Sequence, residues 1–235
     1  MKYMGSKNRY AKQLLEITLK DRQLEQWYVE PFCGGCNVID KVDGNRIAND
    51  INWHLIEMWK VLVYAEWQPP EFLTWDQYQD IKNNKDYYPS ELVGFVGIAC
   101  SYAGKWFGGF ARGNDSFDNP RNYCDESRRN VLKQVDGLRG TIFYNREYSK
   151  FYIPENSIVY CDPPYQNTTK YKDANFNHEI FWDWIREMSK YHKVFVSEYS
   201  APKDFKCVWE KSVNSSLDKD TGSKQGTERL FTIKN

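Results

Sequence analysis

Four consecutive residues, Asp162-Pro163-Pro164-Tyr165, directly follow an apolar run and combine groups that suit a planar amine. Two prolines fix φ and remove two amide donors, so the carbonyls at this point are held stiffly. The Asp162 carboxylate and the Pro163 carbonyl can each accept a hydrogen bond from an NH2 group, and Tyr165 can stack on the ring that bears it. Two acceptors draw the amine lone pair out of conjugation, as methylation of an aromatic amine requires. A plain strand-to-turn exit is the alternative, since Asp and Pro favour it too.

A second group, Glu30-Pro31-Phe32-Cys33-Gly34-Gly35, follows another short apolar run. Glycines after a first strand let the backbone come close to a bound cofactor. Asp50 follows the next apolar segment and can accept hydrogen bonds from ribose hydroxyls. A tight turn also needs glycine without any ligand. The absence of a G-x-G-x-x-G pattern argues against a nicotinamide cofactor.

A third group is Tyr3-Met4-Gly5-Ser6-Lys7. Lys7 is expected at the start of a helix, where it can pair with a ligand carboxylate while the helix N-terminus adds amide donors. The alternative is that Lys7 is merely an exposed lysine, which is by far the commoner fate of a lysine considered alone. The three histidines stand apart from any acid or Ser or Cys nucleophile, so we expect surface or packing roles for them: His54, His178 and His192.

Composition excludes some classes of protein. Cys33 and Cys36 form a C-x-x-C, but no second pair stands at zinc-like spacing, so we expect no metal and no disulfide framework. The chain has 32 Lys and Arg residues and 32 Asp and Glu residues, so its net charge gives no indication of a nucleic-acid partner. No apolar run reaches roughly 18 residues, and the first ten residues lack a signal-peptide core. We therefore expect no membrane contact and a cytoplasmic protein.

Strand and helix patterns alternate along the chain. A helix is expected from Ser6 to Lys20 and another over about 177–191, because apolar residues recur there at helical spacing. Short apolar runs bounded by Gly, Pro and polar residues predict strands at 27–30, 46–48, 141–144, 157–160, 193–199, 207–213 and 227–234.

This alternation predicts a doubly wound α/β sheet whose last two strands form an antiparallel hairpin. Ligands of such sheets bind beyond the carboxyl ends of the strands, and Gly34, Asp50 and Asp162 all follow predicted strands directly. Residues 54–140 interrupt the pattern, first with Trp-rich helical segments. They continue into 101–123, which is dense in Gly and aromatics and is interpreted as an irregular loop or hairpin.

Taken in this order, the motifs resemble those of the Dam-like D12 class of DNA adenine-N6 methyltransferases. The resemblance covers nearly the whole chain apart from the middle. Its motifs are Y-x-G-x-K at 3–7, VEPFCGG at 29–35, ANDIN at 48–52, YCDPPY at 160–165, FVSEY at 195–199 and ERLF at 228–231.

The resemblance implies a class I S-adenosylmethionine-dependent methyltransferase fold, with a mostly parallel seven-stranded sheet and a mainly helical insertion. Residues 1–53 and 141–235 would form the catalytic domain, and 54–140 the target-recognition region. The implied reaction moves a methyl group from S-adenosylmethionine to N6 of an adenine flipped out of double-stranded DNA, leaving S-adenosylhomocysteine. The implied setting is the cytoplasm of a bacterial or phage-infected cell, with no obligate protein partner.

The same resemblance assigns site residues. Tyr3 and Lys7 would hold the methionine part of the cofactor, and Asp162, Pro163 and Tyr165 would grip the target adenine. The other cofactor-binding residues would be Phe32, Gly34, Asp50 and Tyr148, with Asp162 shared between the two sites. Cys36 stands where the family usually has glycine, which leaves the backbone path there open.

Within 101–123, three cations suit phosphates, and Arg can also bind a guanine edge: Lys105, Arg112 and Arg121. Three aromatics set among glycines either stack where the flipped base leaves a gap or pin the loop to the core: Trp106, Phe107 and Phe110.

Three other functions are weighed against this pattern. An RNA methyltransferase acting on a guanine amine also suits D-P-P-Y, although the insertion after Asp50 and the motif at 3–7 favour DNA adenine. Protein glutamine methylation is typical of N-P-P-Y, which Asp162 argues against. A catalytically dead DNA-binding remnant would have little reason to keep Lys7, Asp50, Asp162 and Tyr165 together.

Overall fold

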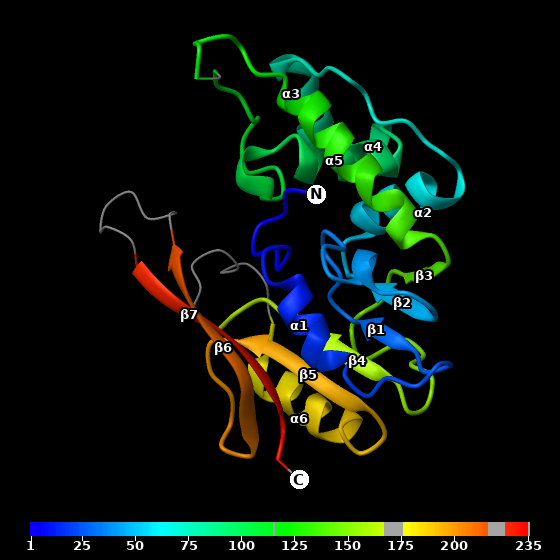
Figure 1. Ribbon diagram of the computed structural model, residues 1–235. Coiled ribbons are helices and arrows are strands. Elements are labelled where there is room, and N and C mark those ends of the chain that lie inside the picture. Colours follow the sequence, from blue (N-terminus) through cyan, green and yellow to red (C-terminus); the bar gives the residue numbers. More distant parts are fainter. Residues whose placement is uncertain (115, 167–175, 216–223, 235) are drawn as a thin grey trace.

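A computed structural model of the chain describes residues 1–114, 116–166, 176–215 and 224–234. Within these ranges seven strands form one sheet in the order β3-β2-β1-β4-β5-β7-β6 (Figure 1). The strands are β1 (Tyr28–Glu30), β2 (Arg46–Asn49), β3 (Thr141–Tyr144), β4 (Ile158–Cys161), β5 (Lys193–Glu198), β6 (Phe205–Ser215) and β7 (Lys224–Ile233). The first five are parallel, whereas β7 runs antiparallel to both β5 and β6. The predicted mostly parallel sheet with an antiparallel closing hairpin is confirmed.

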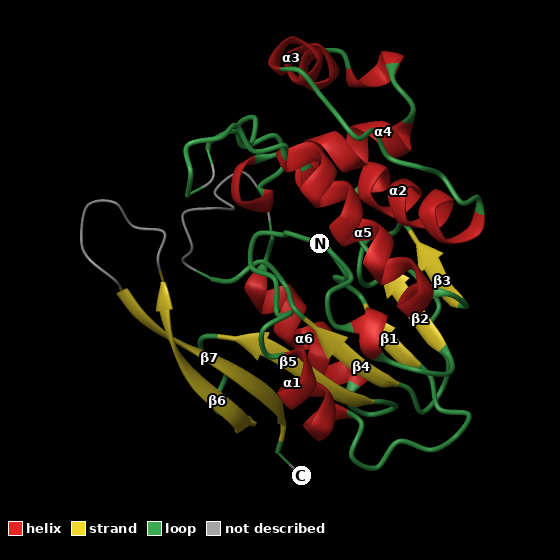
Figure 2. Ribbon diagram, turned by 45° about the horizontal axis from the view of Figure 1, so that its top comes forward, coloured by secondary structure: helices red, strands yellow, loops and turns green. Residues whose placement is uncertain are grey.

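Helices cover both faces of this sheet. They are α1 (Ala11–Thr18), α2 (Trp53–Tyr64), α3 (Trp75–Asn83), α4 (Ser90–Gly94), α5 (Tyr123–Leu138) and α6 (His178–Met188). Figure 2 shows α2 to α5 gathered at one side of the molecule, while β6 and β7 extend past the other strands at the opposite side. The helix predicted at 177–191 is four residues shorter, and the strand predicted at 207–213 is longer at both ends.

Period-two alternation along the strands builds two apolar cores. Tyr28, Ile158 and Phe195 are buried in the cluster that also holds the apolar side chains of α1 and α5. Their neighbours along the chain, among them Val159 and Val196, are buried in a second cluster with the apolar side of α6. The central strands are buried on both faces, as parallel strands in a doubly wound sheet must be.

The first helix does not begin at Ser6 as predicted. It begins at Ala11, and the preceding residues form consecutive turns in which the Ser6 amide donates to the Tyr3 carbonyl at 3.0 Å and the Tyr10 amide to the Lys7 carbonyl at 2.8 Å. The reason is tertiary, because the buried Lys7 side chain is paired 3.0 Å from Asp162. The expected helix N-terminus at Lys7 is therefore wrong.

The middle of the chain agrees in outline with its predicted character. The Trp-rich pattern after residue 53 forms α2, and α3 and α4 follow, with a π-helical turn at Phe95–Ala99. Residues 101–122 are irregular, with one 3-10 turn at Tyr102–Gly104 and two isolated bridges in the described part. The long helix α5 then leads the chain back to β3.

A buried arginine fastens the end of α5 to the sheet. Arg46, the first residue of β2, donates to the carbonyls of Val42 and Gly137 at 2.5 Å each, Arg139 at 2.5 Å and Gly44 at 3.0 Å. The last carbonyls of a helix have no partner within the helix, so this guanidinium satisfies groups that burial would otherwise leave unpaired.

Replacing Arg46 with Ala should lower the free energy of unfolding by about 2–4 kcal/mol, because several carbonyls and the end of α5 lose their partner. Urea unfolding followed by circular dichroism measures the effect. Arg139→Ala is the matched control, since Arg139 is half-exposed and pairs only with the exposed Asp136. Equal stability of the two variants would contradict the fastening role of Arg46.

Candidate active site

The carboxyl ends of β1, β2 and β4 open into one cavity of about 920 Å³, within the size range of small-molecule sites. Every predicted cofactor and catalytic residue lines it: Tyr3, Lys7, Phe32, Gly34, Asp50, Tyr148, Asp162, Pro163 and Tyr165. The parallel sheet therefore brings together residues that lie far apart in the sequence.

The amine-binding end of the cavity is organised around Lys7. Its Nζ lies 3.0 Å from Asp162 Oδ1 and 3.7 Å from Glu228 Oε2, and it donates to the Gly5 carbonyl at 3.0 Å. Burial works to lower the pKa of Lys7, but the carboxylates of Asp162 and Glu228 outweigh burial and hold this pKa above its ordinary value. Lys7 is therefore a fixed cation inside the cavity.

The Tyr165 ring is held from several directions. Its hydroxyl donates to Glu228 Oε2 at 2.7 Å, and Lys7 Nζ lies 4.5 Å from the ring centroid. Tyr199 meets the ring edge to face, with centroids 4.7 Å apart and planes at 83°. Burial raises the pKa of Asp162, against the opposing effect of Lys7. A carboxylate, a rigid proline carbonyl and an aromatic platform thus converge on one spot.

Glu198 is a site residue that the sequence analysis missed. It ends β5, is buried, and accepts hydrogen bonds from the amides of Tyr199 at 2.7 Å and Gln166 at 3.1 Å. Burial raises the pKa of Glu198 to about 7. The residue thus ties the chain after Tyr165 to the end of β5. Its position at the end of a buried apolar run was the signal in the sequence.

The cofactor end of the cavity depends on the first glycine turn. The Gly34 amide donates to Asp50 Oδ2 at 2.9 Å, and the Asn52 amide donates to Oδ1 at 2.9 Å. Gly34 has φ +44°, and a Cβ there would come within 2.7 Å of the Tyr3 ring. Only glycine fits this position, and Asp50 fixes the turn as well as facing the cavity.

The backbone at Cys36 adopts the conformation that glycine favours. Cys36 has φ +51° and is fully buried. Gln134 on α5 donates to the carbonyls of Gly35 and Cys36 at 3.2 Å each, which fixes the path of the turn. The left-handed conformation costs a non-glycine residue about 1–2 kcal/mol. The departure from the family pattern therefore leaves a glycine-like backbone in place.

Glu30 is a second carboxylate whose role the sequence analysis did not assign. It ends β1, lines the cavity, and accepts a hydrogen bond from the Tyr28 hydroxyl at 3.2 Å. Burial raises the pKa of Glu30 well above its usual value. An acidic residue that closes a fully buried strand was the signal, because such a group needs a partner. A cationic amine in the cavity would supply one.

Aromatic and aliphatic side chains form the remaining wall. Phe32 and Tyr148 lie 5.2 Å apart between centroids, and Phe176 packs against both. Ile51 and Ile180 line the same cavity and are 72% and 60% exposed. This apolar wall beside Asp50 suits a purine attached to a ribose, so the residues present fit S-adenosylmethionine.

The residues predicted to contact DNA fall into different environments. Lys105 is exposed at the cavity lining, and Arg112 is exposed on the loop. Arg121 pairs with Glu126 through two hydrogen bonds of 2.9 and 2.6 Å, so its charge is balanced within the chain. The contacts of these three residues with DNA stay a prediction.

The aromatics of the loop divide between the two roles left open. Phe107 and Phe110 pack against Tyr78 of α3, with centroids 5.6 and 5.4 Å apart, so they pin the loop to the helices. Trp106 stacks on His54 and lines the cavity. The idea that all three could fill the gap left by a flipped base is therefore wrong for the two phenylalanines.

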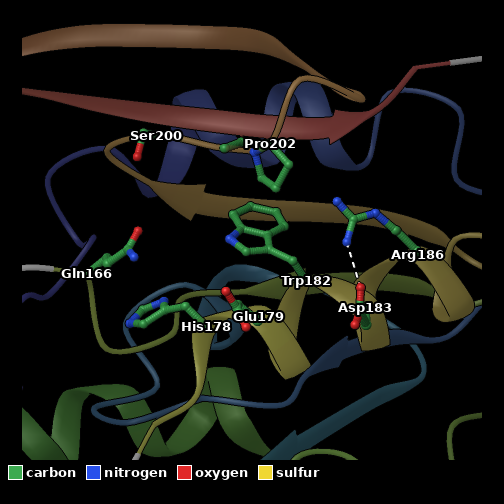
Figure 3. A pocket seen from close by; sticks show the side chains of 9 residues that line it. Gln166, His178, Glu179, Trp182, Asp183, Arg186, Ser200 and Pro202 are labelled. Carbon is green, nitrogen blue, oxygen red and sulfur yellow. Dashed lines mark hydrogen bonds and ion pairs between the residues drawn. The ribbon is translucent and has the colours of Figure 1, made fainter.

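A second hollow of about 520 Å³ lies between α6 and the segment after β5 (Figure 3). Arg186 in this hollow is bound to Asp183 and Asp204, so its charge is already paired. The strand ends that carry the predicted motifs open elsewhere, and the larger cavity is the candidate active site.

Among the described residues, no cluster of His, Cys, Asp and Glu could hold a metal ion, and no helix is long and apolar enough to cross a membrane.

Comparison with known proteins gives a consistent picture. Residues 3–92 match the family model of the D12 class N6 adenine-specific DNA methyltransferases. The Type II methyltransferase M.FokI of Planomicrobium okeanokoites is 26% identical over 213 residues, which cover 79% of this chain and 31% of that protein. Modification methylase StsI of Streptococcus sanguinis is 28% identical over 209 residues, which cover 78% of this chain and 31% of that protein. The chain thus spans about a third of the length of these relatives.

Among solved structures, TrmN from Thermus thermophilus matches with a TM-score of 0.41 and 12% identity, covering 96% of this chain and 48% of that chain. A likeness at that level carries no argument, and the fold rests on the strand order and the antiparallel closing hairpin described above. The chain is thus similar to the D12 class of N6 adenine-specific DNA methyltransferases over residues 3–92, and the order of its motifs agrees with this likeness.

Proposed function

We propose that this chain transfers a methyl group from S-adenosylmethionine to N6 of an adenine in double-stranded DNA, as a modification enzyme in the cytoplasm of a bacterial or phage-infected cell. The observation that carries the proposal is that the acceptor group Asp162, Pro163 and Tyr165 shares one cavity with the glycine turn and Asp50. An amine held by the first group lies in the same cavity as a cofactor held by the second.

Different residues would bind the ribose, the adenine and the methionine part of S-adenosylmethionine. The Asp50 carboxylate would accept hydrogen bonds from the ribose hydroxyls, and Phe32 and Tyr148 would contact the adenine ring. Glu30 would pair with the amino group of the methionine part, and Tyr3 lines the same cavity. Bound in this way, S-adenosylmethionine supplies a methyl group on a sulfonium that is already a competent electrophile.

The base residues orient the acceptor. Asp162 and the Pro163 carbonyl would accept the two amine protons, which aims the nitrogen lone pair out of the ring plane. Flipping a base out of a duplex costs roughly a few kcal/mol, and stacking on Tyr165 offsets part of this. No strong base is needed, since the amine loses its proton readily once it carries the methyl group. Positioning and electrostatics therefore supply most of the rate.

The function is tested by incubating the chain with unmethylated DNA and S-adenosylmethionine, then sequencing single DNA molecules. Modified adenines in one recurring sequence are expected. Methylation confined to guanine amines of RNA would favour the rival enzyme, whereas cofactor binding without methylation of either nucleic acid would favour a catalytically dead remnant.

Replacing Asp162 with Ala should lower the rate of methyl transfer by about 10²–10³, because one preorganised polar group facing the amine is lost. The circular dichroism spectrum should stay near that of the unmodified chain, whereas the unfolding midpoint should fall, because the buried Lys7 loses the nearer of its two carboxylates. The measurement is incorporation of label from S-adenosylmethionine into DNA. Asp183→Ala is the matched control, since Asp183 is exposed and lies outside the cavity. Near-normal turnover of the Asp162 variant would show that the site assignment is wrong.

Replacing Asp50 with Ala should weaken S-adenosylmethionine binding at least about tenfold, since hydrogen bonds to charged groups contribute about 1.5–3 kcal/mol. Loss of the support that Asp50 gives to the Gly34 amide acts in the same direction. Isothermal titration calorimetry gives the affinity, and Asp43→Ala, an exposed residue just before β2, serves as the control. Unchanged affinity would place the ribose elsewhere.

We also propose that Lys105 and Arg112 contact DNA phosphates, because both are exposed on the loop and Lys105 lies at the cavity. Each single change to Ala should weaken binding to cognate and scrambled duplexes alike and reduce the salt slope by about 1. Arg121→Ala should have a smaller effect, because Glu126 already neutralises Arg121. Binding is measured at several salt concentrations. Loss of sequence preference without loss of salt slope would instead indicate a base contact.

A further inference from the structure

Glu228 of β7 has no role in the reaction described above, yet it contacts both parts of the amine-binding site. Its Oε2 accepts the hydroxyl of Tyr165 at 2.7 Å and lies 3.7 Å from Lys7 Nζ. The side chain is only 15% exposed. A carboxylate buried to this degree must be matched by partners, and both of these partners belong to the site.

The register of the closing hairpin explains how Glu228 reaches this point. Glu228 pairs with Lys211 on β6, and the next residue, Arg229, pairs with Glu198 on β5. Because side chains alternate along a strand, Glu228 shares a face with the buried Leu230, while Arg229 points the other way and binds Glu210. The alternation therefore puts the Glu228 carboxylate on the same side of the sheet as α1 and the turn that carries Lys7.

We propose that Glu228 is a positioning residue for methyl transfer, which fixes the Tyr165 ring through its hydroxyl and shares the charge of Lys7 with Asp162. This inference rests on the proposed function. Glu228 lines the cavity, and this role gives it no direct contact with the base or the cofactor. It acts through Tyr165, which would stack on the base, and through Lys7, which lies against Asp162.

The first effect is on the stacking platform. A tyrosine ring has two free side-chain torsions, and an anchored hydroxyl removes most of that freedom. With Lys7 Nζ 4.5 Å from the centroid, one face of Tyr165 is occupied, and Tyr199 closes the ring edge. The opposite face is thereby held in one orientation for the base, so less ordering has to occur when the base arrives.

The second effect is on the acceptor. Lys7 lies between two carboxylates, at 3.0 Å from Asp162 and 3.7 Å from Glu228. Because the Lys7 ammonium is shared by two carboxylates, it neutralises Asp162 less than it would if it paired with Asp162 alone. Asp162 therefore keeps more capacity to accept a hydrogen bond from the amine. Removing Glu228 would concentrate the Lys7 charge on Asp162 and weaken that capacity.

Four variants test the inference in a methylation assay with unmethylated plasmid DNA and labelled S-adenosylmethionine. Glu228→Ala removes both the acceptor and the charge, and kcat should fall about 10- to 100-fold. Glu228→Gln keeps an acceptor for Tyr165 and should recover part of that loss. Tyr165→Phe keeps the ring and loses the hydroxyl. Glu210→Ala, exposed on the same hairpin and bound to Arg229, is the matched control and should be unchanged.

A double variant that combines Glu228→Ala with Tyr165→Phe distinguishes a positioning role of Glu228 from a general loss of structure. If Glu228 acts largely through the Tyr165 hydroxyl, the losses in Glu228→Ala and Tyr165→Phe should not multiply in the double variant. The KM for S-adenosylmethionine should stay within about twofold in Glu228→Ala, because Asp50 and the glycine turn are untouched and Lys7 keeps its ion pair with Asp162.

Several results would overturn the inference while leaving the proposed function intact. They are normal kcat in Glu228→Ala, fully multiplying losses in the double variant, or an equal loss in Glu210→Ala. An inactive unmodified chain on every DNA tested would instead overturn the proposed function, and the inference with it. The activity of the unmodified chain therefore distinguishes the two failures.

Discussion

The ion pair between Lys7 and Asp162 is the constraint on which the site depends. It joins the amino-terminal turns to the end of β4, two parts of the chain separated by more than half its length. Burying a lysine is costly unless its charge is matched, and here Glu228 adds a third member from the closing hairpin. Because Lys7 lies between the two carboxylates, these ion pairs hold the three segments together as a unit.

The cavity is rich in acid and poor in base. Glu30, Asp162, Glu198 and Glu228 all border it or lie at its edge, against the single buried cation Lys7. Burial raises the pKa values of Glu30, Asp162 and Glu198, because it imposes a cost on the charged form of each carboxyl group. A positively charged cofactor reduces that cost, so the electrostatics of the chain favour a sulfonium with an amino group over an anionic ligand.

Local pattern predicted the sheet well, because short apolar runs bounded by Gly and Pro coincide with all seven strands. The convergence of Gly34, Asp50 and Asp162 followed from topology alone, since parallel strands share their carboxyl ends. The start of the first helix could not be predicted in the same way. Helical spacing continues back to Ser6, but the pairing of Lys7 with Asp162 overrides it, and that contact depends on a strand more than 150 residues later.

The same limit explains why Glu228 was not found from sequence. Its position on the buried face is implied by alternation with Leu230, but its partners are set by the antiparallel register of β7 on β5 and by the turns around Lys7. Residue types near the strand ends therefore predict which groups a cavity will contain, whereas the tertiary fold decides which of those groups restrain one another.

The insertion and the cofactor site are mechanically connected. Gly104 packs so closely on the amino-terminal segment that a Cβ there would lie 2.7 Å from the Tyr3 Cα, and its carbonyl accepts the Met4 amide at 3.1 Å. Tyr3 in turn rests on Gly34 of the glycine turn. A loop that begins at Gly104 and carries Lys105 and Trp106 into the cavity cannot shift without moving the residues proposed to hold the cofactor. Gly104, Tyr3 and Gly34 therefore join the loop of the insertion to the glycine turn, so these two parts of the chain pack together at the cavity.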